Sequence, residues 1–385
     1  MTPDPEYPRF SDAEFERRRR AVAELMEAEG LDALLVHGAA ASPGTVHYLT
    51  NYLAGRPTWL LYPSRGEPAL FLHFANHLPT ARAMSVVEDV RWSGQSASRT
   101  LADELGRRGL AGASLGVVGL AVTVPYAQFA DLRERLPDAR FRDVSRAYHR
   151  IRWRRSDEEM AWFARSAELT DGACRLLEER IRPGLSEHDL QAVVHEAFLP
   201  HGGQLAIAFV TSTSMANPDR FVPWQYPTAR RLRPGDVVIT EITVAWWGYG
   251  AQVHRPFAVG EEPAPLYREL FDVAYECYER VRSALRPGAT SDDVVRTAGV
   301  IEERGFTVCD SVVHGEGGKN PELGTPGSVH AVDPWTFEEG QVMVIQPNPV
   351  APDGRAGLQL GAAVRVGSDG GESLHRYPFA FPVCG

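Results

Sequence analysis

The feature that most constrains the fold of this chain is an internal repeat. The segment Ile181-Arg-Pro-Gly-Leu-Ser-Glu-His-Asp-Leu returns as Leu285-Arg-Pro-Gly-Ala-Thr-Ser-Asp-Asp-Val. Each copy follows one helical pattern and precedes a second, Ser-capped helical pattern that ends at a glycine. Solenoid proteins contain more copies of a shorter repeating unit. Two copies that begin as far apart as Ile181 and Leu285 therefore predict a duplicated domain.

Strand-like segments follow each copy of the repeat. They cover residues 237–244 and 251–259 after the first copy, and 341–347 and 357–366 after the second. Short apolar runs bounded by glycine and proline favour strands. Helices outside a curved antiparallel sheet, in two related halves, would form an α+β layer arrangement with a cleft between the halves.

The part before the repeat alternates between helix and strand. Ser11 and Glu14 predict a capping box for a helix that ends at Gly30. Apolar runs at 33–36, 58–62, 69–73 and 114–118 predict strands separated by helical stretches. This pattern is typical of a small α/β domain.

The length of 385 residues exceeds that of one ordinary domain. We place the first domain at residues 1–150 and the second at 151–385. A capping box formed by Ser156 and Glu159 opens the first long helix of the second domain.

Composition restricts the partners of the chain. The formal net charge of −10 argues against nucleic acid as the main partner. The four cysteines show neither a disulfide framework nor a zinc-binding spacing. No segment approaches the roughly 20 apolar residues that span a bilayer. We therefore expect a cytoplasmic protein with no membrane partner.

A series of motifs then matches a known family in order. They are the helix after Arg155, Arg182-Pro-Gly-Leu-Ser-Glu, Arg233-Pro-Gly-Asp, Tyr249 to Gly260, Arg286-Pro-Gly, His314-Gly-Glu-Gly and Glu339-Gly-Gln-Val-Met-Val-Ile-Gln-Pro. These motifs resemble the pita-bread family, which includes methionine aminopeptidase, aminopeptidase P, prolidase, creatinase and ectoine hydrolase. The segments Asp32-Ala-Leu-Leu-Val and Tyr48-Leu-Thr-Asn resemble the preceding creatinase-type N-terminal domain. The resemblance implies a duplicated pita-bread catalytic domain after a smaller α/β domain. It also implies a homodimer in which the N-terminal domain overhangs the partner's active site.

The resemblance also implies a changed metal site. Peptidases of the family hold two divalent metals through two Asp, one His and two Glu. The corresponding positions here are Glu241, Gln252, His314, Gln346 and a position near Gly361. A neutral amide is a weak ligand, and two divalent ions need several carboxylates for charge compensation. We therefore expect no metal and no cofactor.

Creatinase is the family's precedent for hydrolysis without metals, and ectoine hydrolase similarly carries a Glu at the position of Glu241. This chain departs from creatinase at three places. His254 replaces a catalytic-site Glu, Trp224 replaces a His, and Gln346 replaces a retained Glu. These departures argue against creatine as the substrate.

Three residues are predicted to be catalytic. Glu241 lies in the apolar run Val-Ile-Thr-Glu-Ile-Thr-Val, where burial should raise its pKa and suit it as a general base or nucleophile. A buried structural ion pair is the alternative. His254 shares one face of its strand with Gln252. His314 precedes glycines that would let a substrate approach the backbone.

The residues predicted to bind substrate are Gln252, Arg255, Gln346, Asn348, Trp224 and Tyr249. Arg255 points to the opposite strand face from His254, so tying strands together is an equal alternative for it. The aromatic residues have the alternative of packing in a core. Glu316, His330 and Asp333 have no spacing that identifies a role.

These residues favour a metal-independent hydrolase of a C–N bond in a small polar molecule, such as an amidine, cyclic amidine, guanidine or amide. Three alternatives stay open. A carboxylate and imidazoles in a dry cleft suit a lyase, cyclase or isomerase equally. A non-catalytic pseudo-peptidase that binds a peptide or a protein is the second. A metal-dependent Xaa-Pro peptidase is the third.

Overall fold

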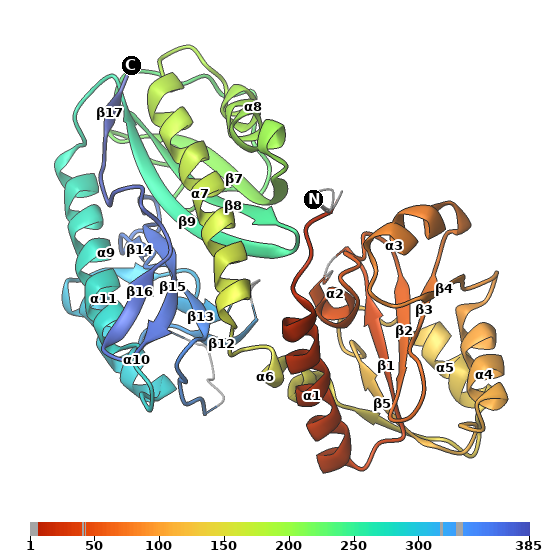
Figure 1. Cartoon of the computed structure of the whole chain (residues 1–385). Coiled ribbons are helices and arrows are strands. Elements are labelled where there is room, and N and C mark those ends of the chain that lie inside the picture. The colour runs from red at the N-terminus through yellow and green to blue at the C-terminus, as the bar shows by residue number, and fades with distance from the viewer. Residues whose placement is uncertain (1–6, 41, 43, 316–318, 329–333) are drawn as a thin grey trace. The chain divides into compact units, whose positions relative to one another are not determined.

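The computed structural model describes residues 7–40, 42, 44–315, 319–328 and 334–385. The chain divides into two compact units, Met1–Trp153 and Arg154–Gly385 (Figure 1). Each unit has its own sheet and its own core.

The N-terminal unit is built on a six-stranded sheet in the order β4-β3-β2-β1-β5-β6. Its strands are β1 (Ala33–Gly38), β2 (Thr58–Pro63), β3 (Ala69–Leu72), β4 (Asp89–Trp92), β5 (Ser114–Val118) and β6 (Arg140–Asp143). Strand β1 pairs antiparallel with β2 and parallel with β5, so the sheet is mixed. This confirms the small α/β domain expected from the alternating pattern.

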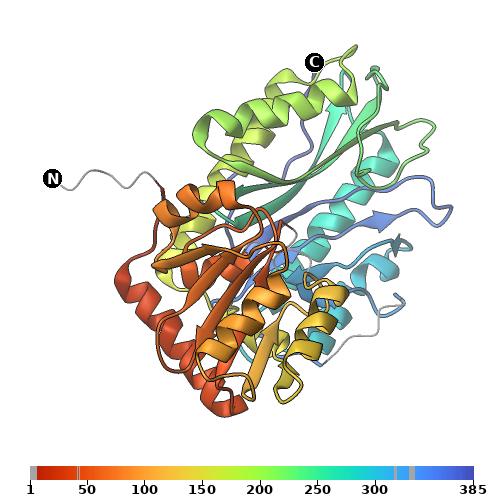
Figure 2. The same ribbon diagram turned by 90° about the vertical axis from the view of Figure 1, so that its right-hand side faces the viewer.

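Helices cover both faces of this sheet (Figures 1 and 2). They are α1 (Asp12–Glu29), α2 (Gly44–Thr50), α3 (Leu78–Met84) with the short 3₁₀ turn η1 (Ala75–His77), α4 (Ala97–Arg107), α5 (Tyr126–Arg135) and α6 (Ser145–Ile151). Helix α1 begins and ends as predicted, because the Ser11 hydroxyl accepts from the Glu14 N–H and Gly30 adopts a left-handed conformation. The Glu14 carboxylate pairs with Arg17 and Arg18.

The C-terminal unit carries the two copies of the repeat on its helices. These are α7 (Asp157–Arg180), α8 (Glu187–Phe198) with η2 (Leu199–His201), α9 (Pro265–Ala284), α10 (Ser291–Ala298) and α11 (Val300–Glu303). Helices α8 and α10 follow the two Arg-Pro-Gly turns, and each starts with a capping box. Ser186 caps α8, but Thr290 caps α10 where serine was expected.

The central sheet of this unit has nine strands in the order β12-β11-β13-β15-β9-β8-β7 with β16 and β17 attached. The strands are β7 (Gln204–Ser214), β8 (Asp236–Trp246), β9 (Tyr249–Val259), β11 (Val313–Gly315), β12 (Lys319–Leu323), β13 (Val342–Ile345), β15 (Gly361–Gly367), β16 (Gly370–Ser373) and β17 (Val383–Cys384). A separate pair joins β10 (Thr307–Val308) and β14 (Pro349–Val350). The strands β7 to β9 come from the first half and β11 to β15 from the second, and they meet where β9 pairs antiparallel with β15. The duplication predicted from the repeat is thus one continuous sheet with two halves.

A tight hairpin fixes the register of the two central strands of the first half. Trp246 pairs with Tyr249, and the two residues between them, Trp247 and Gly248, both have positive φ values of 48° and 84°. Two central residues with positive φ form the hairpin turn whose twist matches that of the strands. This turn places Glu241 directly opposite His254.

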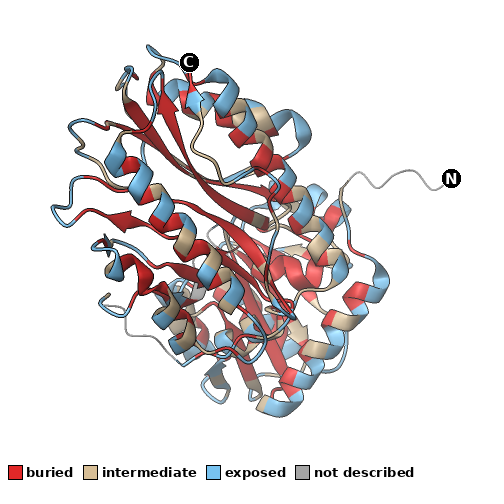
Figure 3. Cartoon of the chain, turned by 90° about the vertical axis from the view of Figure 1, so that its left-hand side faces the viewer, coloured by how far each residue is buried: buried red, intermediate tan, exposed pale blue. Residues whose placement is uncertain are grey.

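The two faces of this sheet differ because side chains alternate along each strand. Helices α7 and α8 cover one face, where the core includes Leu177, Val194, Val253 and Phe257 (Figure 3). Ser166 of α7 ties β8 to β9, since its hydroxyl donates to Val244 O and accepts from Ala251 N. The side chains of Glu241, Gln252 and His254 alternate with those of the core residues along β8 and β9. They therefore lie on the other face of the sheet.

No helix within the described ranges combines the length and the apolar character needed to cross a bilayer.

Candidate active site

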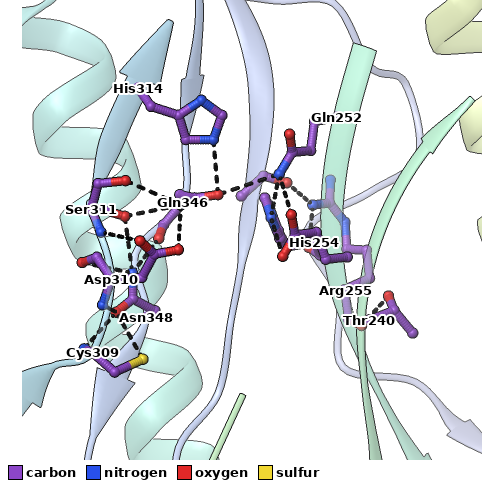
Figure 4. A network of polar contacts seen from close by, with 12 residues as sticks. Thr240, Gln252, His254, Arg255, Cys309, Asp310, Ser311, His314, Gln346 and Asn348 are labelled. Atoms are coloured by element: carbon purple, nitrogen blue, oxygen red, sulfur yellow. Dashed lines mark hydrogen bonds and ion pairs between the residues drawn. The ribbon is translucent and has the colours of Figure 1, made fainter. Parts of the chain in front are cut away.

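Polar side chains from both halves of the sheet meet at its centre (Figure 4). From the first half, the amide nitrogen Nε2 of Gln252 donates to Glu241 Oε1 at 2.9 Å and lies 3.1 Å from Nε2 of His254. From the second half, Gln346 Oε1 lies 3.3 Å from the same Gln252 nitrogen. The amide of Gln252 therefore joins the two halves.

The carboxyl group of Glu241 is largely buried in this cluster. Its side chain keeps only 16% of its surface exposed, and its Oε2 lies 4.0 Å from His254 Nε2. Burial, with a smaller contribution from the charge of Asp310, raises the pKa of Glu241 to about 7. The carboxyl group can therefore both accept and donate a proton near neutral pH.

His254 is fully buried beside this carboxyl group. Burial, followed by the charges of His314 and Arg255, lowers the pKa of His254 well below its ordinary value. The ring is therefore neutral, and its Nε2 accepts from the Gln252 amide. Its Nδ1 makes no hydrogen bond with the described part of the chain.

His314 lies on β11 across from Gln346. Its Nδ1 is 2.7 Å from the carbonyl oxygen of Gly315, and its Nε2 is 3.1 Å from Gln346 Oε1. Both residues are buried, with 6% and 3% of their surface exposed. The structure thus brings together Glu241, Gln252, His254, His314 and Gln346, all of which were singled out in the sequence.

Asn348 supports this cluster from below and does not line it. Its Oδ1 accepts from the N–H groups of Cys309 and Asp310, and its Nδ2 donates to Ser311 O and Gln346 O. The side chain is fully buried, so these bonds use its polar atoms. The structure therefore places Asn348 against backbone groups beneath the cluster, and its binding of substrate stays a prediction.

Arg255 also lies outside the cluster. It is fully buried on the helix-covered face, and its guanidinium donates to the carbonyl oxygens of His254, Gly361, Tyr377 and Pro378. The same group stacks on Phe379 at 4.0 Å. The alternation of the strand puts Arg255 on the opposite face from His254, and these contacts favour the alternative in which Arg255 ties strands together.

The two predicted aromatic residues have other surroundings. Tyr249 shares the helix face with Arg255, is 5% exposed, and donates its hydroxyl hydrogen to Glu159 Oε1 at 2.9 Å. Trp224 is 44% exposed and stacks on Arg220 at 4.0 Å. Tyr249 is thus a core residue, and the contacts of Trp224 do not bring it to the cluster. Glu316, His330 and Asp333 lie outside the described residues.

Asp310 belongs to the cluster but was missed by the sequence reasoning. Its Oδ2 accepts from Gln346 Nε2 at 3.2 Å, and its Oδ1 accepts from Ser311 N at 2.7 Å. Asp310 precedes strand β11 in a loop with no periodic pattern. Asp310 is identified as a member of the cluster only by its hydrogen bond with Gln346 in the folded structure.

The donor set of this cluster does not fit a dinuclear metal site. The amide N–H of Gln252 points at Glu241, where a metal would need an oxygen or nitrogen lone pair. A Cβ at Gly361 would lie 2.1 Å from Ile345 O, so the backbone leaves no room for a side chain at this position. Among the described residues, no group of three or more His, Cys, Asp or Glu side chains could hold a metal ion.

A continuous sheet in two related halves, with a polar cluster at their junction, is the architecture of the pita-bread fold. The chain belongs to metallopeptidase family M24, whose model matches residues 161–368. The Creatinase/Prolidase N-terminal domain matches residues 18–153. Both matches confirm the resemblance drawn from the motifs.

Relatives and solved structures agree with this assignment. The creatinase of Bacillus sp. (strain B-0618) is 23% identical over 97% of this chain and 93% of its own length. The Xaa-Pro dipeptidase of Lactobacillus delbrueckii subsp. lactis is 24% identical over 87% of this chain and 90% of its own length. The structure of an X-Pro aminopeptidase from Thermotoga maritima MSB8 superposes with a TM-score of 0.83 at 18% identity, covering 95% of this chain and 99% of that one. The last likeness shows the fold alone.

Proposed function

We propose that this chain hydrolyses a C–N bond in a small polar molecule, such as an amidine, cyclic amidine, guanidine or amide, without a dinuclear metal centre. The observation that carries this proposal is the position of Glu241. By the motif resemblance, Glu241 falls at a metal-ligand position of the family's peptidases. Its carboxyl group is hydrogen-bonded to an amide, and burial raises its pKa to about 7. A carboxylate with such a pKa is suited to general base catalysis.

The geometry supports a two-residue acid–base mechanism. Glu241 takes a proton from water as the water oxygen bonds to the carbon of the C–N group. His314 is hydrogen-bonded to Gln346 and donates a proton to the departing nitrogen as the C–N bond breaks. Gln252 holds the Glu241 carboxylate in place. The proton on Glu241 then returns to His314 through solvent, which restores the site.

Turnover in heavy-oxygen water tests the hydrolase. One atom of the heavy isotope should enter the product at the carbon released from nitrogen, since water supplies that oxygen. A product formed without the isotope would exclude hydrolysis and would favour a lyase, cyclase or isomerase that uses the same groups. Amidines, guanidines and amides of small size form the first screen.

The second candidate function is that of a metal-dependent Xaa-Pro peptidase. Several relatives favour it, because the matching proteins from Pyrococcus furiosus, Pyrococcus horikoshii and two Lactobacillus species are all named Xaa-Pro dipeptidase. The side chains at the expected metal-ligand positions count against a peptidase. These positions carry the amides of Gln252 and Gln346 and the glycine Gly361. Release of proline from Xaa-Pro dipeptides in the presence of Mn²⁺, Co²⁺ or Zn²⁺ would establish the peptidase.

Metal content gives a prediction that separates these two candidates. We expect protein purified without added metal to contain Mn, Co and Zn well below one ion per chain. We also expect chelation or added Mn²⁺ to leave its thermal midpoint unchanged, because a ligand that binds only the folded state would raise it. Elemental analysis and a thermal melt measure both quantities. A stoichiometric metal, lost together with activity on chelation, would establish the peptidase instead.

A further inference from the structure

The amide of Gln346 has one orientation that its neighbours permit. Its Nε2 lies 3.2 Å from Asp310 Oδ2, 3.0 Å from Ser311 O and 3.5 Å from Ser311 Oγ. The carbonyl oxygen of Ser311 can accept a hydrogen bond but cannot donate one, and the same holds for Asp310 Oδ2 when the carboxylate is ionised. The nitrogen of the amide therefore faces Asp310, and its oxygen faces His314.

Asp310 itself is held firmly enough to impose this choice. One carboxylate oxygen accepts from the backbone N–H of Ser311 at 2.7 Å, and the other accepts from Gln346. Its backbone N–H, together with that of Cys309, donates to the buried Asn348 side chain. Asn348 thereby holds the backbone of Cys309 and Asp310 in place, and this backbone positions the Asp310 carboxylate.

This orientation determines the hydrogens on His314. Its Nδ1 faces the carbonyl oxygen of Gly315 at 2.7 Å, and its Nε2 faces the carbonyl oxygen of Gln346 at 3.1 Å. Neither oxygen can donate, so a favourable contact at both nitrogens requires a hydrogen on each. With the Gln346 amide reversed, Nε2 would accept and the ring would carry one hydrogen.

We propose that Asp310 is a positioning residue of the active site, which orients the Gln346 amide so that its oxygen accepts a hydrogen from Nε2 of His314. His314 then enters the reaction as a proton donor. Asp310 acts through Gln346 and does not itself contact the substrate in this scheme. The expected effect of Asp310 on turnover rests on the proposed function. The expectation that Nε2 of His314 carries a hydrogen does not depend on that function.

Nuclear magnetic resonance of the histidine rings tests this arrangement without a substrate. In protein labelled with ¹⁵N at histidine, His314 should show N–H protons on both ring nitrogens, assigned by their absence in His314→Gln. In Asp310→Ala the Nε2–H signal should be lost while the Nδ1–H signal to Gly315 remains. In Asp310→Asn a single oxygen must serve both Ser311 and Gln346, so the signal should be weakened.

The control is Asp369→Asn, which removes an exposed carboxylate elsewhere on the unit and should leave both signals intact. A wild-type ring without the Nε2–H signal would overturn the proposal. So would a folded Asp310→Ala protein that keeps this signal. If a substrate is found, Asp310→Ala should lower kcat with little change in KM, because the interaction acts on proton donation and not on binding. Failure to find a hydrolytic substrate would count against the proposed function but leave the ring measurement valid.

Discussion

Replacing Glu241 with Gln is expected to lower kcat by about 10²-fold to 10⁴-fold, the usual contribution of a positioned general base. The amide keeps the size of the carboxyl group but cannot take a proton from water. The rate constant should be measured on the substrate that the heavy-oxygen experiment identifies. The matched control is Glu262→Gln, since Glu262 is an exposed carboxylate paired with Arg268 and should leave turnover unchanged.

The pH dependence of wild-type turnover should follow the same group. Because the pKa of Glu241 is raised to about 7, kcat/KM should fall as the pH decreases through this value and the base becomes protonated. This acid limb should be absent from the residual activity of Glu241→Gln.

The stability of the same variant distinguishes a lost base from a damaged fold. Between the ordinary pKa of 4.5 and the folded value of about 7, the folded state binds more protons than the unfolded state. The wild-type free energy of unfolding should therefore fall as the pH rises through this window. Glu241→Gln has no carboxyl group to ionise, so it avoids this loss of stability. It should be more stable than wild type at pH 8 by about 3 kcal/mol, at about 1.4 kcal/mol per unit between the two pKa values. Urea unfolding at pH 4 and pH 8 measures the difference, and a variant less stable at pH 8 would show that Glu241 is a structural anion.

The variant also addresses the pseudo-peptidase alternative. A protein that only binds peptides should keep its affinity for them when Glu241 is replaced with Gln. Isothermal titration with the Xaa-Pro dipeptides used in the peptidase assay gives this comparison. Tight binding without turnover in both proteins would favour the binding function.

Replacing Arg255 with Met is expected to lower the free energy of unfolding by about 3–5 kcal/mol, because each buried carbonyl oxygen that loses its partner costs about 1–3 kcal/mol. The guanidinium donates to Pro378 O at 2.9 Å, His254 O at 2.8 Å, Gly361 O at 2.6 Å and Tyr377 O at 3.0 Å. Met fills the space but removes the hydrogen bonds that Arg255 donates to these carbonyl oxygens. This loss is a large part of the 5–15 kcal/mol that stabilises a typical protein.

Urea unfolding followed by circular dichroism measures this loss. Arg296→Met is the control, because the side chain of Arg296 is 74% exposed and its pairing with Asp293 should contribute little. If Arg255→Met unfolds at the wild-type urea concentration but binds substrate poorly, Arg255 would have the substrate-binding role first expected for it.

Much of the fold could be predicted because its signals are local. The cap at Ser11, the capping box at Ser156 and Glu159, and the strand at Ser114–Val118 depend on residues a few positions apart. The duplication was visible as two copies of one turn. The boundaries of β13 and β15 differed more, since the predicted segments 341–347 and 357–366 became Val342–Ile345 and Gly361–Gly367.

The sequence by itself determined that Glu241 would lie in a buried strand and that Gln252 and His254 would share a face. It also has amides at positions 252 and 346, on which the expectation of no metal rests. Strand alternation and residue chemistry are sufficient for these conclusions. Only the tertiary structure decided that Arg255 binds backbone carbonyls, that Asn348 holds a loop, and that Asp310 orients Gln346. The partners in these contacts come from strands and loops far apart in the chain, and hydrogen bonds depend on which groups the folded sheet brings within about 3 Å.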